Sequence, residues 1–323
     1  MPPFPKPRFD YDYVLGDQIE AVRKHRDTAP ERKIPKKTKS SILIASWNIA
    51  NLGVQQRRDK DYRLIAEIIS WFDLVAVQEV NDDLSGLESV LQQLKQAAPG
   101  CAYRTVFSDK GGNDERLAYV FDANKVQLLD MVGELAIPPA QHRFITLPGV
   151  SRKFTGFDRN PYVAAFKCRG FRFTLANVHL YFGGESKADL DRRSLETYAI
   201  GRWAHLRRDD VHAYTDNIIA LGDFNMPKAK PGDPIYNALT KRGLHLPDHT
   251  SKVGSNLAGD SHYDQIAFVP GVKDQEFTGQ HGMFDFDGGL FADLYQSHTN
   301  KQFRAFTKYY ISDHRPLWAR FKT

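Results

Sequence analysis

The sequence has few cysteines and no long apolar run, and both absences limit the classes of protein that it can encode. Only two cysteines, Cys101 and Cys168, occur among 323 residues. Neither a disulfide framework nor a zinc-binding cysteine pattern is therefore indicated. No window approaches about 18 uninterrupted apolar residues, and the proline-rich start lacks the apolar stretch of a secretory signal. We expect a cytoplasmic protein without a transmembrane segment.

The net charge is small, and most of it lies at one end of the chain. The sequence carries 44 Lys and Arg against 39 Asp and Glu, a formal net charge of +5. Residues 1–40 hold ten of these basic and six of these acidic residues, so a net charge of +4 precedes an almost neutral body. Proteins that hold nucleic acid through phosphate contacts usually concentrate basic residues on one surface. The global charge therefore gives no argument for a nucleic-acid partner.

Composition divides the chain into a basic extension, residues 1–40, and one large domain, residues 41–323. Within the extension, residues 14–26 have the spacing of a short amphipathic helix. Residues 29–41, with four lysines around a proline, are typical of a linker. Such a charged run is usually solvated, although it also suits contact with nucleic acid or an acidic membrane. We find no internal repeat in the domain.

The domain alternates short apolar runs with helical periodicity, a pattern typical of a mixed α/β fold. About ten strands and three or four helices are predicted, and no linker separates them. The predicted helices cover residues 62–71, 84–98 and 188–207. The predicted strands cover residues 42–47, 74–77, 103–107, 117–121, 126–131, 162–167, 171–178, 218–221, 263–269 and 317–321.

Polar residues follow several of these strands directly. They are Asn48, Glu79, His179, Asp223 and Asn225. Taken singly, such a residue is most often a turn, capping or core residue. Several strand ends on one rigid sheet, however, can bring their side chains to a single site. The set as a whole therefore predicts a functional site at the edge of the sheets.

Four short motifs contain these residues, two more follow them along the chain, and the order of all six is informative. In this order, they closely resemble the motif series of the endonuclease/exonuclease/phosphatase superfamily over residues 41–323. That resemblance implies a four-layer α/β sandwich, in which two mixed β-sheets pack face to face with helices outside. The motifs are Trp47-Asn48-Ile49, Gln78-Glu79-Val80, Asn177-Val178-His179, Gly222-Asp223-Phe224-Asn225, Tyr263-Asp264 and Ser312-Asp313-His314-Arg315-Pro316.

Within the superfamily, the sequence is most similar to the deoxyribonuclease I-like branch. A histidine at position 179 favours this branch, because abasic-site endonucleases usually place a different polar residue there. Four further stretches agree: Glu115-Arg116, Asn124-Lys125-Val126, Phe157-Asp158-Arg159-Asn160-Pro161 and Phe284-Asp285-Phe286. The resemblance implies a metal-dependent phosphodiesterase, a hydrolase of the nuclease type.

The resemblance also implies a divalent cation bound by oxygen ligands. Glu79 and Asp313 are hard carboxylate ligands, and Asn48 adds a neutral oxygen donor. Such a set suits Mg²⁺ with several retained waters, with Mn²⁺ or Ca²⁺ as alternatives. A bound cation would neutralise charge on the phosphoryl oxygens during hydrolysis.

The remaining site residues are expected to move protons and to hold the phosphate. The resemblance pairs His314 with Asp264 for activation of the water, and His179 with Glu115 for protonation of the leaving group. Asp223 and Asn225 match a phosphate-proximal pair, and the sequence leaves open whether Asp223 or His314 takes the proton of the water. Arg159 matches a phosphate-contacting arginine, and Asn48 and Asn225 are the other predicted phosphate contacts.

The substrate is less constrained than the chemistry. Where deoxyribonuclease I has two minor-groove arginines and a stacking tyrosine, this chain has Ala50, Asn81 and Asn113. We predict a DNA endonuclease, with the basic extension replacing some of the lost contacts, and no stable protein partner. A phosphoesterase acting on a phospholipid headgroup, a phosphoinositide or RNA is the alternative. Exposed aromatics at Tyr181-Phe182-Gly183-Gly184 would favour a membrane substrate, whereas a glycine turn explains this stretch more simply. A catalytically inactive binding module is disfavoured, because every expected site residue is present.

Overall fold

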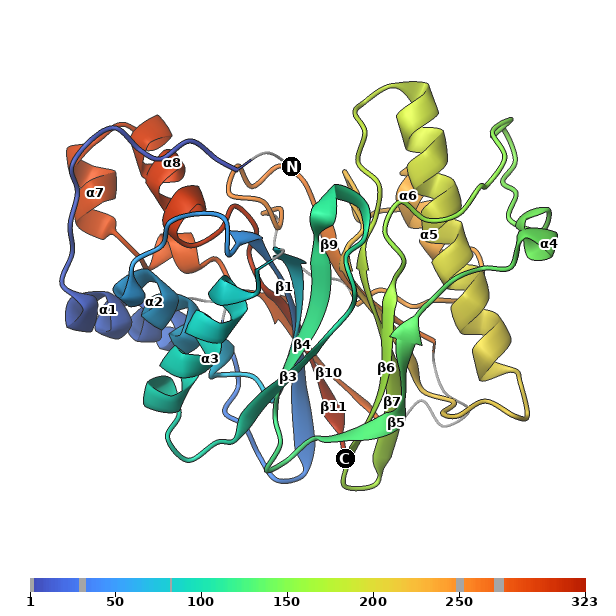
Figure 1. The fold of residues 1–323 in the computed structure, drawn as a ribbon, viewed down its shortest axis with the longest axis horizontal. Helices are drawn as coiled ribbons and strands as arrows, with labels where there is room; N and C mark the ends of the chain where they lie inside the picture. Colours follow the sequence, from blue (N-terminus) through green and yellow to red (C-terminus); the bar gives the residue numbers. More distant parts are fainter. Residues whose placement is uncertain (1–2, 29–32, 82, 248–252, 270–275) are drawn as a thin grey trace.

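Two β-sheets pack face to face in the computed structural model, and helices cover the outer side of each (Figure 1). The structure describes all residues except 1–2, 29–32, 82, 248–252 and 270–275. Residues 29–32 belong to the predicted linker, and residue 2 to the proline-rich start, so these parts of the extension lie outside the described residues. The predicted fold class, a four-layer α/β sandwich, is confirmed.

The first sheet has six strands in the order β10-β11-β1-β2-β4-β3. β1 and β2 run parallel to each other, and the other neighbours are antiparallel. The carboxyl ends of β1 and β2 therefore lie at the same edge of the sheet. The strands are β1 (Ser41–Leu52), β2 (Leu74–Val80), β3 (Tyr103–Phe107), β4 (Arg116–Asp122), β10 (Phe277–Met283) and β11 (Leu317–Lys322).

The second sheet has five strands in the order β5-β6-β7-β8-β9. Here β7 and β8 form the parallel pair, so their carboxyl ends also meet at one edge. The strands are β5 (Gln127–Glu134), β6 (Tyr162–Cys168), β7 (Phe171–His179), β8 (Ile218–Asp223) and β9 (Asp264–Phe268).

The central strands are buried on both faces, which explains their nearly continuous apolar sequence. Side chains of a strand alternate between the two faces of its sheet. In β1, Ile42 and Ile44 belong to the cluster between the sheets, whereas Leu43, Ala45 and Trp47 belong to the cluster under the helices. Polar side chains also join the layers, since Gln78 Nε2 in β2 donates to Asn177 Oδ1 in β7 at 2.6 Å.

Helices cover the outer faces of both sheets (Figure 1). Two of them begin at a capping residue: Ser186 caps one long helix, and Asp233 caps a shorter one that starts at a proline. One group, α1 (Leu15–Thr28), α2 (Asp59–Ile69), α3 (Ser85–Ala97), α7 (Ala292–Ser297) and α8 (Asn300–Tyr310), lies on the side of the first sheet. The other group, α4 (Pro139–His142), α5 (Lys187–Arg208) and α6 (Pro234–Thr240), lies on the side of the second sheet.

The described part of the N-terminal extension packs against the helices of the first sheet. Val22 of α1 is fully buried, and Tyr13 Oη donates to Asp61 Oδ1 at 2.7 Å. Arg23 Nε and Nη2 donate to the two carboxylate oxygens of Glu67 at 2.6 and 3.0 Å. At least one of the basic side chains of the extension is therefore engaged with the domain itself.

Most predicted elements are present, and the errors have physical reasons. All three predicted helices of the domain, the short helix of the extension and the ten predicted strands occur within a few residues of their expected bounds. The prediction of three or four helices in the domain was too low, because α4, α6, α7 and α8 were missed. β10 was also missed, because two glycines interrupt its sequence, Phe277-Thr278-Gly279-Gln280-His281-Gly282-Met283. Among the described residues, no helix is long and apolar enough to cross a membrane.

Candidate active site

The candidate site lies where the parallel strand pairs of the two sheets end. His179 in β7 pairs in register with Asp223 in β8, and Asp223 pairs with Asp264 in β9. Residues paired directly across neighbouring strands share one face of the sheet. Three side chains far apart in the sequence therefore form one row. The first sheet contributes Asn48 of β1 and Glu79 of β2 from its own carboxyl edge.

A glycine makes the close approach of β7 and β8 possible. Gly222, with φ +133°, precedes Asp223, and a Cβ there would lie 2.1 Å from the carbonyl oxygen of Val178. Any other residue would clash with the β7 backbone and adopt a backbone conformation that L-residues avoid. Asn225, two residues later, also has a positive φ of 51°. This local geometry turns the chain sharply at the end of β8 and keeps both polar side chains in the cleft.

Asp223 lies at the centre of the site. Its Oδ2 is 3.7 Å from His179 Nε2 and 3.9 Å from His314 Nε2, and it accepts a hydrogen bond from Asn48 Nδ2 at 3.1 Å. Its Oδ1 accepts from the Asn225 amide N–H at 2.8 Å. Burial opposes ionisation of Asp223, but the neighbouring His314 and His179 bring its pKa below the usual value. Asp223 is therefore held as a carboxylate that two imidazoles flank.

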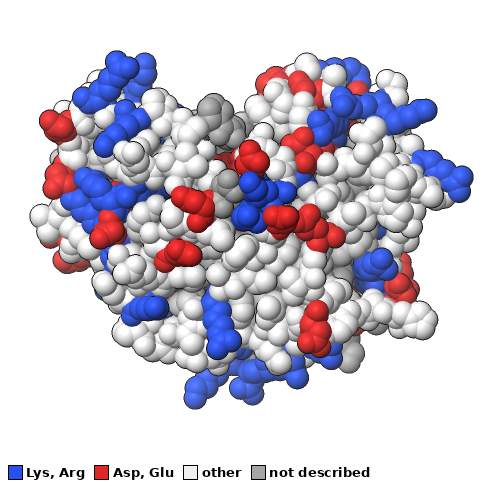
Figure 2. All heavy atoms as spheres, in the orientation of Figure 1, with Lys and Arg blue, Asp and Glu red and all other residues white. Residues whose placement is uncertain are grey.

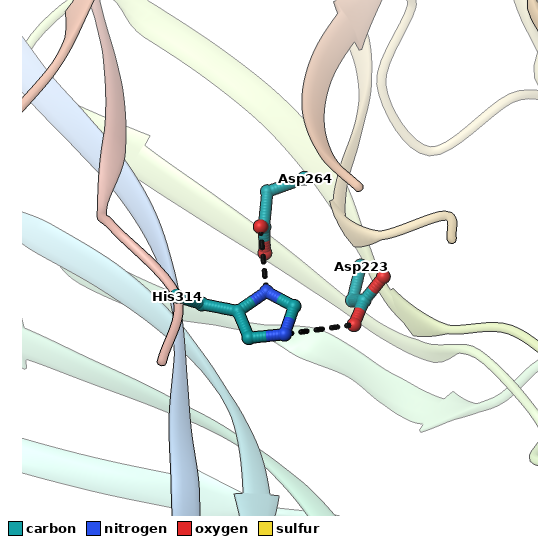
Figure 3. Close-up of side chains that lie close together, drawn as sticks. All are labelled: Asp223, Asp264 and His314. Atoms are coloured by element: carbon teal, nitrogen blue, oxygen red, sulfur yellow. Dashed lines mark hydrogen bonds and ion pairs between the residues drawn. The ribbon is translucent and has the colours of Figure 1, made fainter. Parts of the chain in front are cut away.

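His314 and Asp264 form the first imidazole–carboxylate pair (Figure 3). His314 Nδ1 lies 2.8 Å from Asp264 Oδ2, and its other ring nitrogen faces Asp223. Burial by itself lowers the pKa of His314, yet the carboxylates of Asp264, Asp313 and Asp223 hold it well above the usual value. Burial raises the pKa of Asp264. The ring is thus fixed with Nε2 directed into the cleft.

His179 and Glu115 form the second pair on the other side of Asp223. His179 Nδ1 lies 3.0 Å from Glu115 Oε2, and Glu115 directly precedes β4. Burial opposes ionisation of Glu115, but His179 and Arg159 together lower its pKa to about 2. The two imidazoles therefore present their Nε2 atoms to one carboxylate, each from a carboxylate-oriented ring.

A third group of oxygens lies beside these pairs, formed by Asn48, Glu79 and Asp313. Glu79 has φ 59°, a conformation that is strained for a residue with a side chain and that is common at functional sites. Irregular pairing of β2 with both neighbours accompanies it. Glu79 Oε1 accepts from Asn48 Nδ2 at 3.0 Å, and Oε2 accepts from the Asn51 amide N–H at 2.8 Å.

This oxygen group fits a divalent cation. Asn48 Oδ1 and Asp313 Oδ1 are buried and have no hydrogen-bond partner among the described residues. Burial, together with the charge of Glu79, raises the pKa of Asp313 to about 6. Two buried carboxylates that repel each other, with oxygens left over, are characteristic of a site completed by a cation. A second candidate group is Asp223, Asp264 and His314, whose ligand atoms lie within 4.8 Å of one another.

Two predicted phosphate contacts are bonded mainly to the protein itself. Arg159 Nε and Nη2 donate to the carbonyl oxygens of His179 and Leu180 at 2.7 and 3.1 Å. Its Nη1 lies 3.7 Å from Glu115 Oε2. Asn225 Nδ2 also donates to the Leu180 carbonyl, at 2.8 Å. In this arrangement both side chains fix the chain that follows His179, and Arg159 in addition compensates the charge of Glu115.

Sequence reasoning missed three residues that hold the site together. Ser312 Oγ donates to the Asn48 carbonyl at 2.7 Å and accepts from the amide of His314, so it joins β1 to the His314 loop. Arg193 in α5 is fully buried and donates to the Asn225 carbonyl at 2.9 Å. Glu196, whose pKa burial raises to about 7, accepts from the amides of Asp158 and Tyr181. Arg193 and Glu196 lie in a charged part of a predicted helix, and that pattern does not indicate their long-range contacts. Ser312 could have been found, because it begins one of the six motifs.

Figure 2 shows a hollow at the upper edge of the view, with acidic and basic side chains interspersed around it. In Figure 1 the same edge lies between α8 and α6. The carboxyl ends of β1 and β7 point toward it.

Comparison with known proteins agrees with this fold. No family model matches the sequence. A deoxyribonuclease of Thioalkalivibrio sp. (strain K90mix) is 28% identical over 300 residues, which are 90% of this chain and 73% of that protein. An endonuclease/exonuclease/phosphatase family protein of Bacteroides thetaiotaomicron superposes with a TM-score of 0.51 at 18% identity, over 88% of this chain and 95% of that one.

A second solved structure has a similar likeness. TDP2 of D. rerio, complexed with a single-strand DNA product, superposes with a TM-score of 0.55 at 17% identity, over 88% of this chain and all of that one. The predicted resemblance is therefore confirmed, and so is the prediction of a phosphoester-hydrolysing enzyme at the level of this class. The chain therefore has the fold of the endonuclease/exonuclease/phosphatase family protein that it superposes on.

Proposed function

We propose that the protein is a Mg²⁺-dependent phosphodiesterase that cleaves DNA. The observation that carries this proposal is the pair of carboxylate-oriented imidazoles on either side of Asp223. Hydrolysis of a phosphodiester needs one group that takes a proton from water and another that gives a proton to the leaving oxygen. The name of the curated relative, deoxyribonuclease, and the DNA product bound to TDP2 favour DNA as the substrate.

Water activation is assigned to His314 and Asp223. Their Nε2 and Oδ2 atoms are 3.9 Å apart, which is too long for a direct hydrogen bond and suits one water molecule in contact with both. Asp264 fixes the orientation of His314 and stabilises its imidazolium form. The water oxygen attacks phosphorus while its proton passes to the Asp223 carboxylate, because the raised pKa of His314 keeps its imidazole protonated and leaves that ring to position the water.

Protonation of the leaving oxygen is assigned to His179. As the bond from phosphorus to the leaving oxygen breaks, His179 Nε2 gives that oxygen its proton, and the carboxylate of Glu115 holds the ring at Nδ1. Arg159 bonds the carbonyls of residues 179 and 180 and keeps the ring in position. The two imidazoles thus act on opposite sides of the phosphate, and the proton balance of the step is closed.

The cation is assigned to Glu79, Asp313 and Asn48. When bound there, Mg²⁺ would supply positive charge for the phosphoryl oxygens. The unpartnered oxygens of Asn48 and Asp313 support this choice over the group around His314. In that second group, Asp264 Oδ1 is likewise buried without a hydrogen-bond partner, but Asp264 Oδ2 and His314 Nδ1 already contact each other, so two of its three members are engaged.

A plasmid-nicking experiment tests the proposal. Purified protein is incubated with supercoiled plasmid and Mg²⁺, with EDTA in a parallel reaction, and relaxation is followed on a gel. We expect nicking that requires both the metal and His179. The His179→Ala variant should be inactive, whereas His212→Ala, which removes an exposed histidine outside the site, should retain activity. If folded protein neither nicks the plasmid nor cleaves single-stranded DNA, DNA is contradicted as the substrate, and RNA, a phospholipid headgroup or a phosphoinositide is favoured.

A further inference from the structure

An aromatic surface lies beside His314, and the reaction as proposed above makes no use of it. The ring of Tyr263 is 5.8 Å from the His314 ring, centroid to centroid, and tilted by 34°. The ring of Phe182 is 6.4 Å from the Tyr263 ring at 77°. Phe182 is 37% exposed, and it follows the catalytic strand β7 by only three residues. A row of aromatic side chains therefore leads from the imidazole outward to solvent.

A buried arginine supports Phe182 from within. The Arg193 guanidinium carbon lies 4.8 Å from the centroid of the Phe182 ring, and Arg193 is fully buried. One face of the Phe182 ring thus covers the Arg193 guanidinium, and the rest of the ring is exposed to solvent. Arg193 Nη2 also donates to the carbonyl oxygens of Phe182 and Gly184 at 2.7 and 2.8 Å.

The loop that carries Phe182 is fixed by its own contacts. Tyr181 Oη donates to Asp189 Oδ1 at 2.9 Å, and the Arg192 guanidinium lies 3.9 Å from the centre of the Tyr181 ring. Gly183 has φ +66°, and a Cβ there would lie 2.2 Å from Tyr181 Oη. The turn is therefore closed around Tyr181 and holds the Phe182 ring in place before any ligand binds. A preordered aromatic ring loses little conformational entropy on binding.

We infer that Phe182 and Tyr263 form a stacking platform for one unpaired base next to the scissile phosphate. This inference rests on the proposed function and adds a preference for single-stranded over duplex DNA. An unpaired base offers a free π-face, and stacking on an aromatic side chain contributes about 1–3 kcal/mol per base with little sequence preference. In a duplex, the same face is covered by the neighbouring base pairs.

Kinetics on two single strands test the platform. One substrate is a 12-mer of thymidine, and the other is the same strand with every base replaced by an abasic tetrahydrofuran unit. Phe182→Leu keeps an apolar cover over Arg193 but removes the π-face. We expect this variant to lower kcat/KM on thymidine about 5- to 100-fold and on the abasic strand less than about twofold. Phe182→Trp should restore the preference for thymidine, and Phe144→Leu, at a 46% exposed phenylalanine outside the site, should change neither rate.

The possible outcomes separate this inference from the proposed function. If the unmodified protein cleaves neither strand nor plasmid DNA, the proposed function is wrong and the platform with it. If the unmodified protein cleaves DNA but Phe182→Leu lowers kcat/KM equally on both strands, or on neither, only the platform is wrong. If Phe182→Leu loses activity only on phosphatidylcholine vesicles and keeps full activity on both strands, Phe182 contacts a membrane and the platform is wrong. A selective loss on thymidine with an unchanged melting temperature supports the platform.

Discussion

The two imidazole–carboxylate pairs of the cleft share one geometry and differ in what surrounds the carboxylate. His314 and His179 each contact a carboxylate through Nδ1, at 2.8 and 3.0 Å, and each directs Nε2 at Asp223, at 3.9 and 3.7 Å. The pKa of Asp264 is raised by burial, whereas His179 and Arg159 lower that of Glu115 to about 2.

This difference shows how much each imidazole depends on its own carboxylate. His314 is the cation that acts on Asp264, and the nearby Asp223 is a further anion. Glu115 has two cations, because Arg159 Nη1 lies 3.7 Å from its Oε2. Arg159 also bonds the His179 carbonyl and holds that residue through the backbone. We therefore expect a large loss of activity when Asp264 is neutralised and a smaller loss when Glu115 is neutralised.

Removal of either imidazole should have the largest effect. His314→Ala and His179→Ala should each lower kcat on a DNA substrate by about 100-fold or more, because His314 positions the attacking water beside Asp223 and His179 protonates the leaving oxygen. Both variants should keep the circular dichroism spectrum of the parent, since both side chains lie at the cleft. A folded His314→Ala variant with the turnover of the parent would refute the role assigned to this pair.

Neutralising Asp264 and Glu115 in separate variants tests directly whether the two pairs differ. Asp264→Asn should lower kcat by at least about 100-fold, because the ring of His314 loses both its orientation and its compensating charge. Glu115→Gln should lower kcat only about tenfold, because Arg159 still fixes the chain at His179. Equal losses in the two variants, measured by steady-state kinetics at saturating metal, would contradict the asymmetry between the pairs.

The resemblance to a known family predicted the members of both pairs but not this asymmetry. His179 and Asp223 also stood out by themselves, because each ends an apolar strand, whereas Glu115, Asp264 and His314 were assigned from the resemblance. The two contacts of Arg159 with carbonyl groups depend on how the chain after β7 folds back over the loop of residues 157–160, and no sequence spacing specifies that path.

The bounds of some elements, and the presence of some helices, were predicted less well than the site. β1 was expected to end at Trp47, yet it continues through Asn48 to Leu52 because the polar side chain bonds Glu79 and Asp223 in the interior. α8 carries a usable signal, since Phe303, Phe306 and Tyr310 recur at helical spacing behind a Thr299 cap. The residues that support the site from α5, Arg193 and Glu196, resemble ordinary surface charges until the fold buries them.

A substitution in the oxygen group of Asn48, Glu79 and Asp313 should change the metal dependence of the activity. Glu79→Ala should raise the Mg²⁺ concentration needed for half-maximal activity about tenfold or more, because it removes one charged ligand from a set of three. Glu88→Ala, at an exposed residue of α3, is the matched control and should give the metal titration of the parent. A Glu79→Ala curve that superposes on the control would contradict the assignment of the cation to this cluster.

The smallest expected effect concerns stability and tests the environment of Glu115 without a substrate. Its folded pKa of about 2 lies below the unfolded value of about 4.3. The carboxylate therefore stabilises the fold above about pH 4.3, and this contribution is lost as the pH falls toward 2. Glu115→Gln should lower the free energy of unfolding by about 2–3 kcal/mol at pH 7 and by less at each step toward pH 3, in urea titrations of both proteins. A difference that grows on acidification would mean that the folded protein holds Glu115 protonated, and the two pairs would then have carboxylates of the same kind.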